Sequence, residues 1–162
     1  MDFKTLLPDF EAIKKTDWAK PQLKVDTKDT MGLVMYAGAA LMVIFTFFSW
    51  CTLTAGDASA SKLGITTWYG IFAFICAAAA VVGVLYKHTT LTFTAATLGV
   101  LFAVLGIVLI PSLTFDGVTY NAEEIKELLK NNSKASLSHL GAILYLVATV
   151  ATAAAYLKVT KK

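Results

Sequence analysis

The sequence predicts an all-α integral membrane protein: a bundle of four transmembrane helices, with a small outer hairpin-plus-helix element and an N-terminal cytoplasmic amphipathic segment. Hydrophobic residues make up 57% of the 162 residues and charged residues only 15%, whereas about a quarter of the residues in soluble domains are charged. The charges gather in islands separated by four long, uncharged apolar runs. A run of about 20 such residues can cross a hydrocarbon core of about 30 Å as a helix.

The segment 1–30 precedes the first apolar run and is expected to lie in the cytoplasm. Its apolar residues, including Phe10 and Ile13, recur at roughly helical spacing, with lysines on other faces. This pattern is typical of an amphipathic helix that lies on the inner leaflet or docks on a partner. A frayed tail is the alternative. Phe10 and Ile13 are therefore candidate interaction residues.

The apolar runs set the positions of the four spans. Residues 31–111 hold three of them, and 137–162 holds the fourth, followed by a cytoplasmic tail. The helices are expected over 31–53, 65–86, 90–110 and 137–157, with a polar turn at 54–64 and a tight turn at 87–89.

The connection 112–136 is the only sizeable segment expected on the outer side of the membrane. An Asp-Gly pair at 116–117 lies between short runs rich in apolar residues, which indicates a type I′ hairpin turn. Asn121 and Glu124 then have the spacing of a capping box. This spacing predicts a short helix over 122–130.

The apolar face of that short helix consists of Ile125, Leu128 and Leu129. Such a face is stable only when it is removed from water. It can pack on the outer end of the bundle, on lipid headgroups or against a partner protein. These three residues are therefore candidate interaction residues.

The lysines orient the chain by the positive-inside rule. With both termini and the 87–89 turn inside, ten lysines lie on the cytoplasmic side and four on the outer side. The inner set is Lys4, Lys14, Lys15, Lys20, Lys24, Lys28, Lys87, Lys158, Lys161 and Lys162, and the outer set is Lys62, Lys126, Lys130 and Lys134. Trp50 and Trp68 then fall at one outer interface, as an aromatic belt would place them.

The four predicted spans contain no Asp, Glu, Lys or Arg. Ionisable residues inside a membrane mark proton relays and ion sites, so their absence argues against a proton-coupled transporter. It also argues against a membrane hydrolase, which needs paired carboxylates or clustered histidines. No catalytic, cofactor-binding or metal-binding residue is assigned. All fourteen basic residues are Lys, and without Arg there is no support for nucleic-acid binding.

Small residues recur at four-residue spacing on the second, third and fourth helices. In lipid, such ladders let helices approach closely enough for van der Waals contact to hold them together. They fit a compact monomeric bundle, and they also fit docking of another subunit. The candidate packing residues are Ala73, Ala77, Ala80, Gly83, Ala95, Gly99, Ala103, Ala151 and Ala155.

The two cysteines are predicted to be free thiols. Cys51 ends the first apolar run, whereas Cys76 lies roughly 15 Å deep in the second helix. A disulfide needs Cα atoms within about 7 Å of each other. Both thiols are therefore expected to act as small packing groups.

The first outer connection carries a pattern of Trp and Gly residues: Ser49-Trp50-Cys51, then Leu63-Gly64, then Trp68-Tyr69-Gly70. This pattern resembles the first outer loop of small, uncharacterised bacterial four-helix inner-membrane proteins. In those proteins a Trp ends helix one and a Gly-containing turn leads into helix two. The resemblance covers only this stretch, and it implies a topology and a bacterial inner membrane rather than an activity.

These observations favour a non-enzymatic inner-membrane accessory or scaffold subunit that associates with itself or with a larger membrane complex. Its contact surfaces would be 1–30 and 112–136, and its partners the lipid bilayer and either another membrane protein or further copies of itself. The alternative is a pore- or channel-forming homo-oligomer of a holin-like or small-solute type. A membrane enzyme ranks third, and no cofactor is expected.

Overall fold

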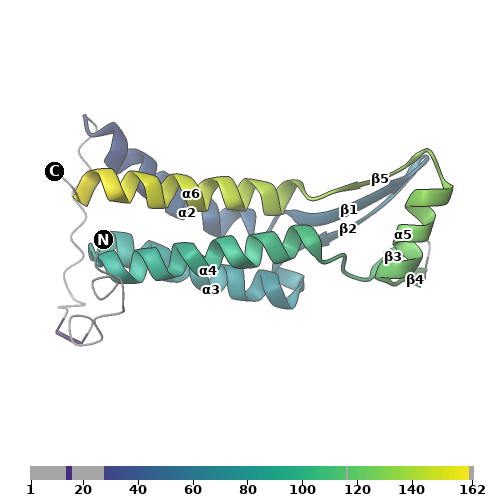
Figure 1. Ribbon diagram of the computed structural model, residues 1–162, viewed down its shortest axis with the longest axis horizontal. Coiled ribbons are helices and arrows are strands. Elements are labelled where there is room, and N and C mark those ends of the chain that lie inside the picture. The colour runs from purple at the N-terminus through teal and green to yellow at the C-terminus, as the bar shows by residue number, and fades with distance from the viewer. Residues whose placement is uncertain (1–13, 16–27, 116, 161–162) are drawn as a thin grey trace.

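Four long helices lie side by side in the computed structural model, which describes residues 14–15, 28–115 and 117–160 (Figure 1). Each of them packs against two of the others, so that the four enclose a common core. The candidate residues Phe10 and Ile13 lie outside the described residues. The helices are α2 (Thr30–Phe45), α3 (Trp68–Leu85), α4 (Thr89–Val108) and α6 (Leu140–Thr160).

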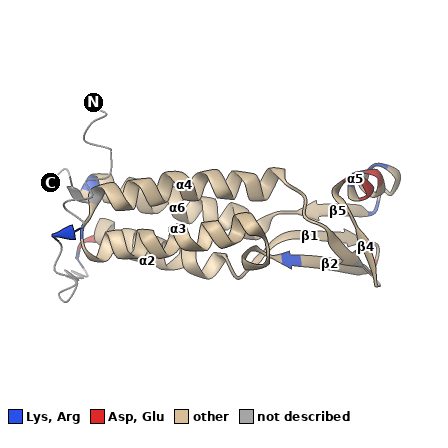
Figure 2. Cartoon of the chain, turned by 90° about the horizontal axis from the view of Figure 1, so that it is seen from below, with Lys and Arg blue, Asp and Glu red and all other residues tan. Residues whose placement is uncertain are grey.

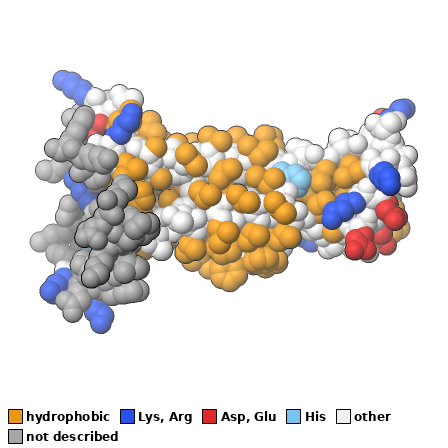
Figure 3. Space-filling model, viewed as in Figure 1, with side chains coloured by type: hydrophobic (Ala, Val, Ile, Leu, Met, Phe, Trp, Pro, Cys, Tyr) orange, Lys and Arg blue, Asp and Glu red, His pale blue; other side chains and the backbone are white. Residues whose placement is uncertain are grey.

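Three of these helices are long and apolar enough to cross a membrane, over Trp68–Leu85, Thr90–Val108 and Leu140–Val159. The fourth, α2, is also apolar but has only 16 residues, or about 24 Å at 1.5 Å per residue. Hydrophobic side chains form a broad band over the helices on the face shown in Figure 3. Charged side chains gather at the two ends of the molecule (Figure 2). These features mark the chain as a membrane protein.

A three-stranded antiparallel sheet extends the molecule beyond one end of the helices (Figure 1). Its central strand, β1 (Ser49–Ala55), pairs with β2 (Ala58–Leu63) on one side and with β5 (Ala135–Ser138) on the other. Leu53, for example, lies opposite both Ala60 and Leu137. A short 3-10 helix, η2 (Gly64–Thr66), leads from β2 into α3. The sheet therefore joins the α2–α3 connection to the α4–α6 connection.

The outer connection also contains the hairpin and the short helix that its sequence predicts. Strands β3 (Leu113–Phe115) and β4 (Val118–Tyr120) form the hairpin, and α5 covers Ala122–Asn131. Asn121 Oδ1 accepts hydrogen bonds from the N–H groups of Glu123 (2.9 Å) and Glu124 (3.0 Å). Glu124 Oε2 in turn accepts one from the N–H of Asn121 (2.8 Å). The predicted capping box is confirmed.

The all-α prediction is wrong in one respect, because the chain also contains this sheet. The first helix ends at Phe45 instead of continuing to residue 53. Most of the expected polar turn 54–64 forms the end of β1 and the whole of β2. The fourth helix begins at Leu140, not at residue 137, because the preceding residues hydrogen-bond to β1. An apolar run with aromatic and β-branched residues fits a buried strand as well as a helix. Here the run forms a strand that pairs with β2, which follows it directly, and with β5, far away in sequence.

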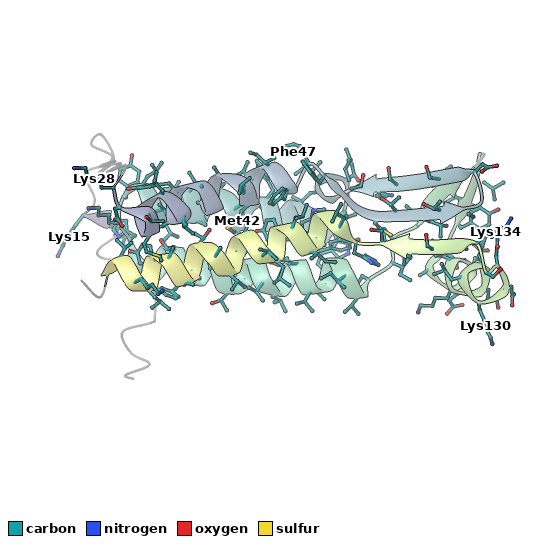
Figure 4. The ribbon with its side chains drawn as sticks, turned by 90° about the horizontal axis from the view of Figure 1, so that it is seen from above. Lys15, Lys28, Met42, Phe47, Lys130 and Lys134 are labelled. Carbon is teal, nitrogen blue, oxygen red and sulfur yellow. The ribbon has the colours of Figure 1, made fainter. Side chains whose placement is uncertain are left out.

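The bundle core combines a few large side chains with many small ones. Met42 and Tyr145 are fully buried in it, and Met42 lies between the helices in Figure 4, whereas Phe47 lies on the outer surface. The Tyr145 hydroxyl donates to the carbonyl oxygen of Ala73 at 2.7 Å and so joins α6 to α3. The hydroxyls of Thr149 and Thr152 donate to carbonyls one turn earlier in α6, both at 2.8 Å. These buried polar groups are thus satisfied within the chain.

The candidate packing residues lie along these helix contacts. Except for Ala151, which is half-buried, all are buried. A Cβ on Gly83 would come within 2.5 Å of the Thr92 hydroxyl oxygen, so the absence of a side chain there lets α3 and α4 approach closely. The buried set is Ala73, Ala77, Ala80, Gly83, Ala95, Gly99, Ala103 and Ala155.

Candidate interaction module

The two connections on one side of the bundle fold together into a single unit, here named the sheet module (residues 49–63 and 110–138). Strand β1 of the first connection is paired along Thr52–Ala55 with β5 of the second. Strand β3 of the second connection lies against β2 of the first. Each connection therefore stabilises the other, and the module projects from the helices as one piece (Figure 1).

The sheet module has a small hydrophobic core of its own. Cys51, Leu53, Leu113 and Ile125 are almost completely buried in it, with Ala60 beside them. Further side chains pack against this core while remaining partly exposed: Ile110, Tyr120, Leu128, Leu129 and Leu137. The module is thus a packed element and not an irregular loop.

This core accounts for the apolar face of α5. Ile125 has no exposed surface, and Leu128 and Leu129 are half-buried beside it. The three candidate interaction residues therefore face their own chain. The sequence left three locations open for the apolar face of α5, and the structure places it on the outer part of its own chain. Ile125 therefore offers no surface to a partner.

Trp50 anchors the sheet module to the bundle. The pairing of β1 with β2 shifts register between Ser49 and Cys51, which leaves Trp50 as the extra residue of a β-bulge. The two consecutive side chains enter different cores: Trp50 packs in the bundle core and Cys51 in the module core. The indole stacks on Tyr69, with ring centroids 6.0 Å apart, and tilts against Tyr145 at 5.4 Å.

Three glycines from different elements make room for the Trp50 indole. An added Cβ would lie 2.5 Å from Nε1 at Gly64, 2.6 Å from Cε3 at Gly106 and 2.8 Å from Cδ1 at Gly141. Contacts this short do not occur at real side chains, so the three positions need glycine for close approach rather than for backbone conformation. The prediction of Trp50 as a residue of an interfacial aromatic belt is wrong, since its side chain is fully buried.

The surface that the module presents outward is charged. On α5 the acidic residues Glu123 and Glu124 lie in the first turn and Lys130 in the last, where each sign is favoured by the helix dipole. Lys126 and Glu127 are also exposed. Figure 2 shows these charges at the tip of the molecule. This charged surface is exposed and can contact another molecule.

Burial shifts the pKa values of two titratable side chains in and beside the module. Desolvation raises the pKa of the Cys51 thiol to about 11. Desolvation also lowers the pKa of His139, which lies between β5 and α6, below its ordinary value. The His139 Nε2 atom is buried and has no hydrogen-bond partner within the described part of the chain. Both groups are thus held in their neutral forms near neutral pH.

The described residues form neither a disulfide nor a candidate metal site. Cys51 and Cys76 are both buried and free, as predicted. Across residues 28–115 and 117–160, no three His, Cys, Asp or Glu side chains lie close enough to share a metal ion.

Little in the sequence indicates the Trp50 anchor, because its three glycines are far apart along the chain. Gly64 and Trp50 belong to the first connection, but Gly106 and Gly141 lie in other helices. Only the folded chain brings them onto one ring. No protein-family model, curated protein or solved structure matches the chain.

Proposed function

We propose that this chain is a non-enzymatic accessory or scaffold subunit of a membrane, and that it uses the sheet module to bind a membrane-protein partner or a further copy of itself. The chain then crosses the bilayer four times, with its termini in the cytoplasm and the module on the other side. The bacterial inner membrane is the location that we propose. The observation that carries the proposal is a separately packed module, held by both connections, with a charged outer surface.

The packing of α2 supports its assignment as the fourth span. It lies against both α3 and α6, and its outward residues, such as Leu41 and Ile44, are exposed and apolar. In water those side chains would be costly to expose, whereas in lipid they are favourable. The following turn adds Phe47, which is also exposed, so the apolar stretch is longer than the helix.

The distribution of lysines supports the orientation. Lys15 and Lys28 lie at one end of the molecule, and Lys130 and Lys134 lie at the other (Figure 4). In the sequence, ten of the fourteen lysines belong to the N-terminal segment, the 87–89 turn and the C-terminal tail. An excess of lysines on one side of a membrane protein is typical of the cytoplasmic side.

Photocrosslinking in the native membrane tests the proposal. A photoreactive amino acid at Glu127 on the exposed face of α5 is expected to give one adduct of defined mass, either with a different membrane protein or with a second copy. The matched control places the same probe at Ile75, which is exposed on α3 within the apolar band, and is expected to give only lipid adducts. The absence of any protein adduct from Glu127 and from Lys130 would contradict the proposal.

Charge reversal on α5 makes this test specific for the surface. Lys126 is exposed and Lys130 lies in the last turn, so the double variant Lys126→Glu/Lys130→Glu is expected to fold normally. It should lose the Glu127 adduct, because rim charges set partner selection and association rate. Ile125→Ser is not a suitable probe, since it would disrupt the module core. An unchanged adduct yield in the charge-reversed variant would show that partner binding does not depend on the charges of α5.

A pore formed by several copies is the alternative function. The interior of one bundle is filled by Trp50, Met42 and Tyr145, so an aqueous path would have to lie between chains. Reconstitution of the purified chain in liposomes separates the two functions. An ion conductance that rises with the amount of reconstituted protein would favour the pore. For the accessory subunit we expect no conductance above that of protein-free liposomes.

A further inference from the structure

One face of the three-stranded sheet carries two rows of hydroxyl side chains. Residues that lie directly opposite each other in an antiparallel sheet project from the same face. Ser61, Thr52 and Ser138 form one row across the three strands, and Ser59, Thr54 and Ser136 form the next. The four serines are exposed, and the two threonines are half-buried. We refer to these six residues as the hydroxyl face.

The hydroxyl face points away from the rest of the sheet module. The alternate residues of the same strands, Leu53, Ala60 and Leu137, pack in or against the module core, which includes a residue of α5. Successive side chains of a strand point to opposite faces, so α5 does not cover the hydroxyl face. Lys62 is the only charged residue of the three strands, and it lies opposite Cys51 of the module core. The hydroxyl face is therefore uncharged.

An apolar groove on the helices lies on the same side of the molecule. The groove has a volume of about 370 Å³, and its lining residues all belong to α2 and α6. In Figure 1, α2, α6 and the sheet run along one side of the molecule, and α3, α4 and α5 run along the other. Figure 4 looks onto the first side. Small residues from both helices line the groove between the exposed side chains of Leu41 and Val147. These small residues are Ala37, Gly38, Ala148 and Ala151.

A second copy of the chain in the same membrane presents this surface at the same height. Copies of one chain insert with one orientation, so a two-fold axis that relates two of them runs along the membrane normal. The strands lie along the long axis of the bundle (Figure 1). The hydroxyl face and the groove therefore point sideways, toward a neighbour in the membrane. A two-fold interface brings the same patch of both copies together, so that hydroxyl face meets hydroxyl face and groove meets groove.

Each part of this surface is complementary to itself. A hydroxyl both donates and accepts a hydrogen bond, so two hydroxyl faces can pair, whereas like charges placed opposite each other repel. In lipid, small residues let helices approach closely enough for van der Waals contact to hold them together. The helix α2 has only 16 residues, and association is one way in which a helix shorter than the hydrocarbon core is accommodated. A second copy thus fits both the outer part and the membrane part of this side.

We propose that the hydroxyl face and the α2–α6 groove together form the surface on which two copies of the chain make a two-fold symmetric dimer. With the axis over the central strand β1, β2 of each copy faces β5 of the other. Ser59 then lies opposite Ser136 of the second copy, because both residues belong to one row of the sheet. The charged surface of α5 lies on the other side and is left for a different partner. The inference rests on the proposed membrane placement, but not on the partner that α5 binds.

Counting of photobleaching steps tests the dimer, with the full chain carrying a C-terminal fluorescent protein in native nanodiscs cut from cell membranes. The unaltered chain is expected to bleach mostly in two steps. Ser59→Glu/Ser136→Glu places like charges opposite each other at two contacts, and is expected to weaken association at least about tenfold and give mostly single steps. Ser59→Glu/Ser136→Lys places opposite charges at the same contacts and should keep the dimer. The matched control is Thr119→Glu on β4, at the other side of the module, which should also keep it.

A second pair of variants tests the groove. Ala37 lines the groove but is itself exposed, so Ala37→Phe fills the groove without entering the core of its own bundle. This variant is expected to lower the fraction of discs that bleach in two steps. Ala78→Phe makes the same change at an exposed position of α3 and should leave that fraction unchanged.

Single steps for the unaltered chain would overturn the proposal, and more than two steps would overturn it in favour of a larger ring. Equal step counts for the Glu/Glu and Glu/Lys chains would also overturn it, because these chains carry new charges at the same two positions and differ only in the sign of one. Equal counts for Ala37→Phe and Ala78→Phe would do the same. Failure of the Glu127 crosslink would leave these results unaffected, since α5 is not part of this surface. Single steps here would likewise leave a Glu127 adduct with a different protein unaffected.

Discussion

The indole N–H of Trp50 donates a hydrogen bond to the carbonyl oxygen of Phe45 at 2.8 Å. Phe45 is the last residue of α2, and Trp50 is the second residue of β1. This bond ties the end of the helix to the start of the strand, and the same carbonyl also accepts a hydrogen bond from the N–H of Phe48 at 3.3 Å. The same ring fills the space among the glycines at the outer end of the bundle. Trp50 thus couples the sheet module to the membrane helices.

Replacement of Trp50 by Ala is expected to destabilise the protein by about 3–5 kcal/mol, the range for large aromatic residues in a core. Trp50→Phe keeps most of the ring and removes only the indole N–H donor, while the Phe45 carbonyl still accepts a hydrogen bond from the Phe48 N–H, and it should cost less. The control is Trp68→Ala, since the Trp68 side chain is 55% exposed. Unfolding free energies measured in mixed micelles check this ranking. Equal losses at the two tryptophans would contradict the anchor.

The Cys51 thiol is expected to resist alkylation at pH 7–8 because its pKa is raised to about 11 and it is fully buried. The thiolate is the reactive form, and it is scarce at that pH. A membrane-impermeant maleimide should therefore modify Cys51 only after denaturation. Rapid labelling of the folded protein would show that the module core is open.

His139 is expected to make the protein less stable in acid. Burial lowers its pKa below the ordinary value of 6.5, so the unfolded state binds the proton more readily than the folded state. The stabilisation is present above about pH 6.5 and is lost as pH falls below it. His139→Gln should show a smaller drop in thermal midpoint from pH 7.5 to pH 5 than the unaltered chain. A drop of the same size in both would place the acid sensitivity elsewhere.

The sequence predicts the local features of the fold well. The apolar runs correspond to α3 and α4 within a few residues, because long apolar segments have few alternatives in a membrane protein. The capping box at Asn121 and the hairpin before it are also present, since both are determined by neighbouring residues. Local chemistry is sufficient for these elements.

The features that depend on distant residues could not be predicted in the same way. The run after Phe45 reads as more helix, but it forms a strand that pairs with β2 and also with β5, some eighty residues later in the chain. The role of Trp50 depends on glycines from three elements, and nothing in its own neighbourhood distinguishes a buried anchor from an interfacial tryptophan. The direction of the α5 apolar face likewise depends on Cys51 and Leu53 of the other connection.

An engineered disulfide tests the pairing of the two connections. Thr54 and Ser136 are opposite residues on β1 and β5, and Cα atoms of such pairs lie about 4.5–5.5 Å apart, within disulfide range. In a Cys51→Ala/Cys76→Ala background, Thr54→Cys/Ser136→Cys is expected to oxidise to an intramolecular bridge. Thr54→Cys/Lys158→Cys, with the second cysteine at the far end of α6, should not. Equal behaviour of the two pairs would contradict the sheet order.

Site-specific labelling of single cysteines measures most directly whether the chain crosses the membrane four times with both connections on one side. In intact cells, a membrane-impermeant maleimide is expected to label Asp57→Cys in the β1–β2 turn and Lys130→Cys on α5 from outside. Lys28→Cys before α2 and Lys87→Cys between α3 and α4 should react only after the membrane is opened. Labelling of Lys28→Cys together with Asp57→Cys in intact cells would show that α2 does not cross, and the account of four spans would be wrong.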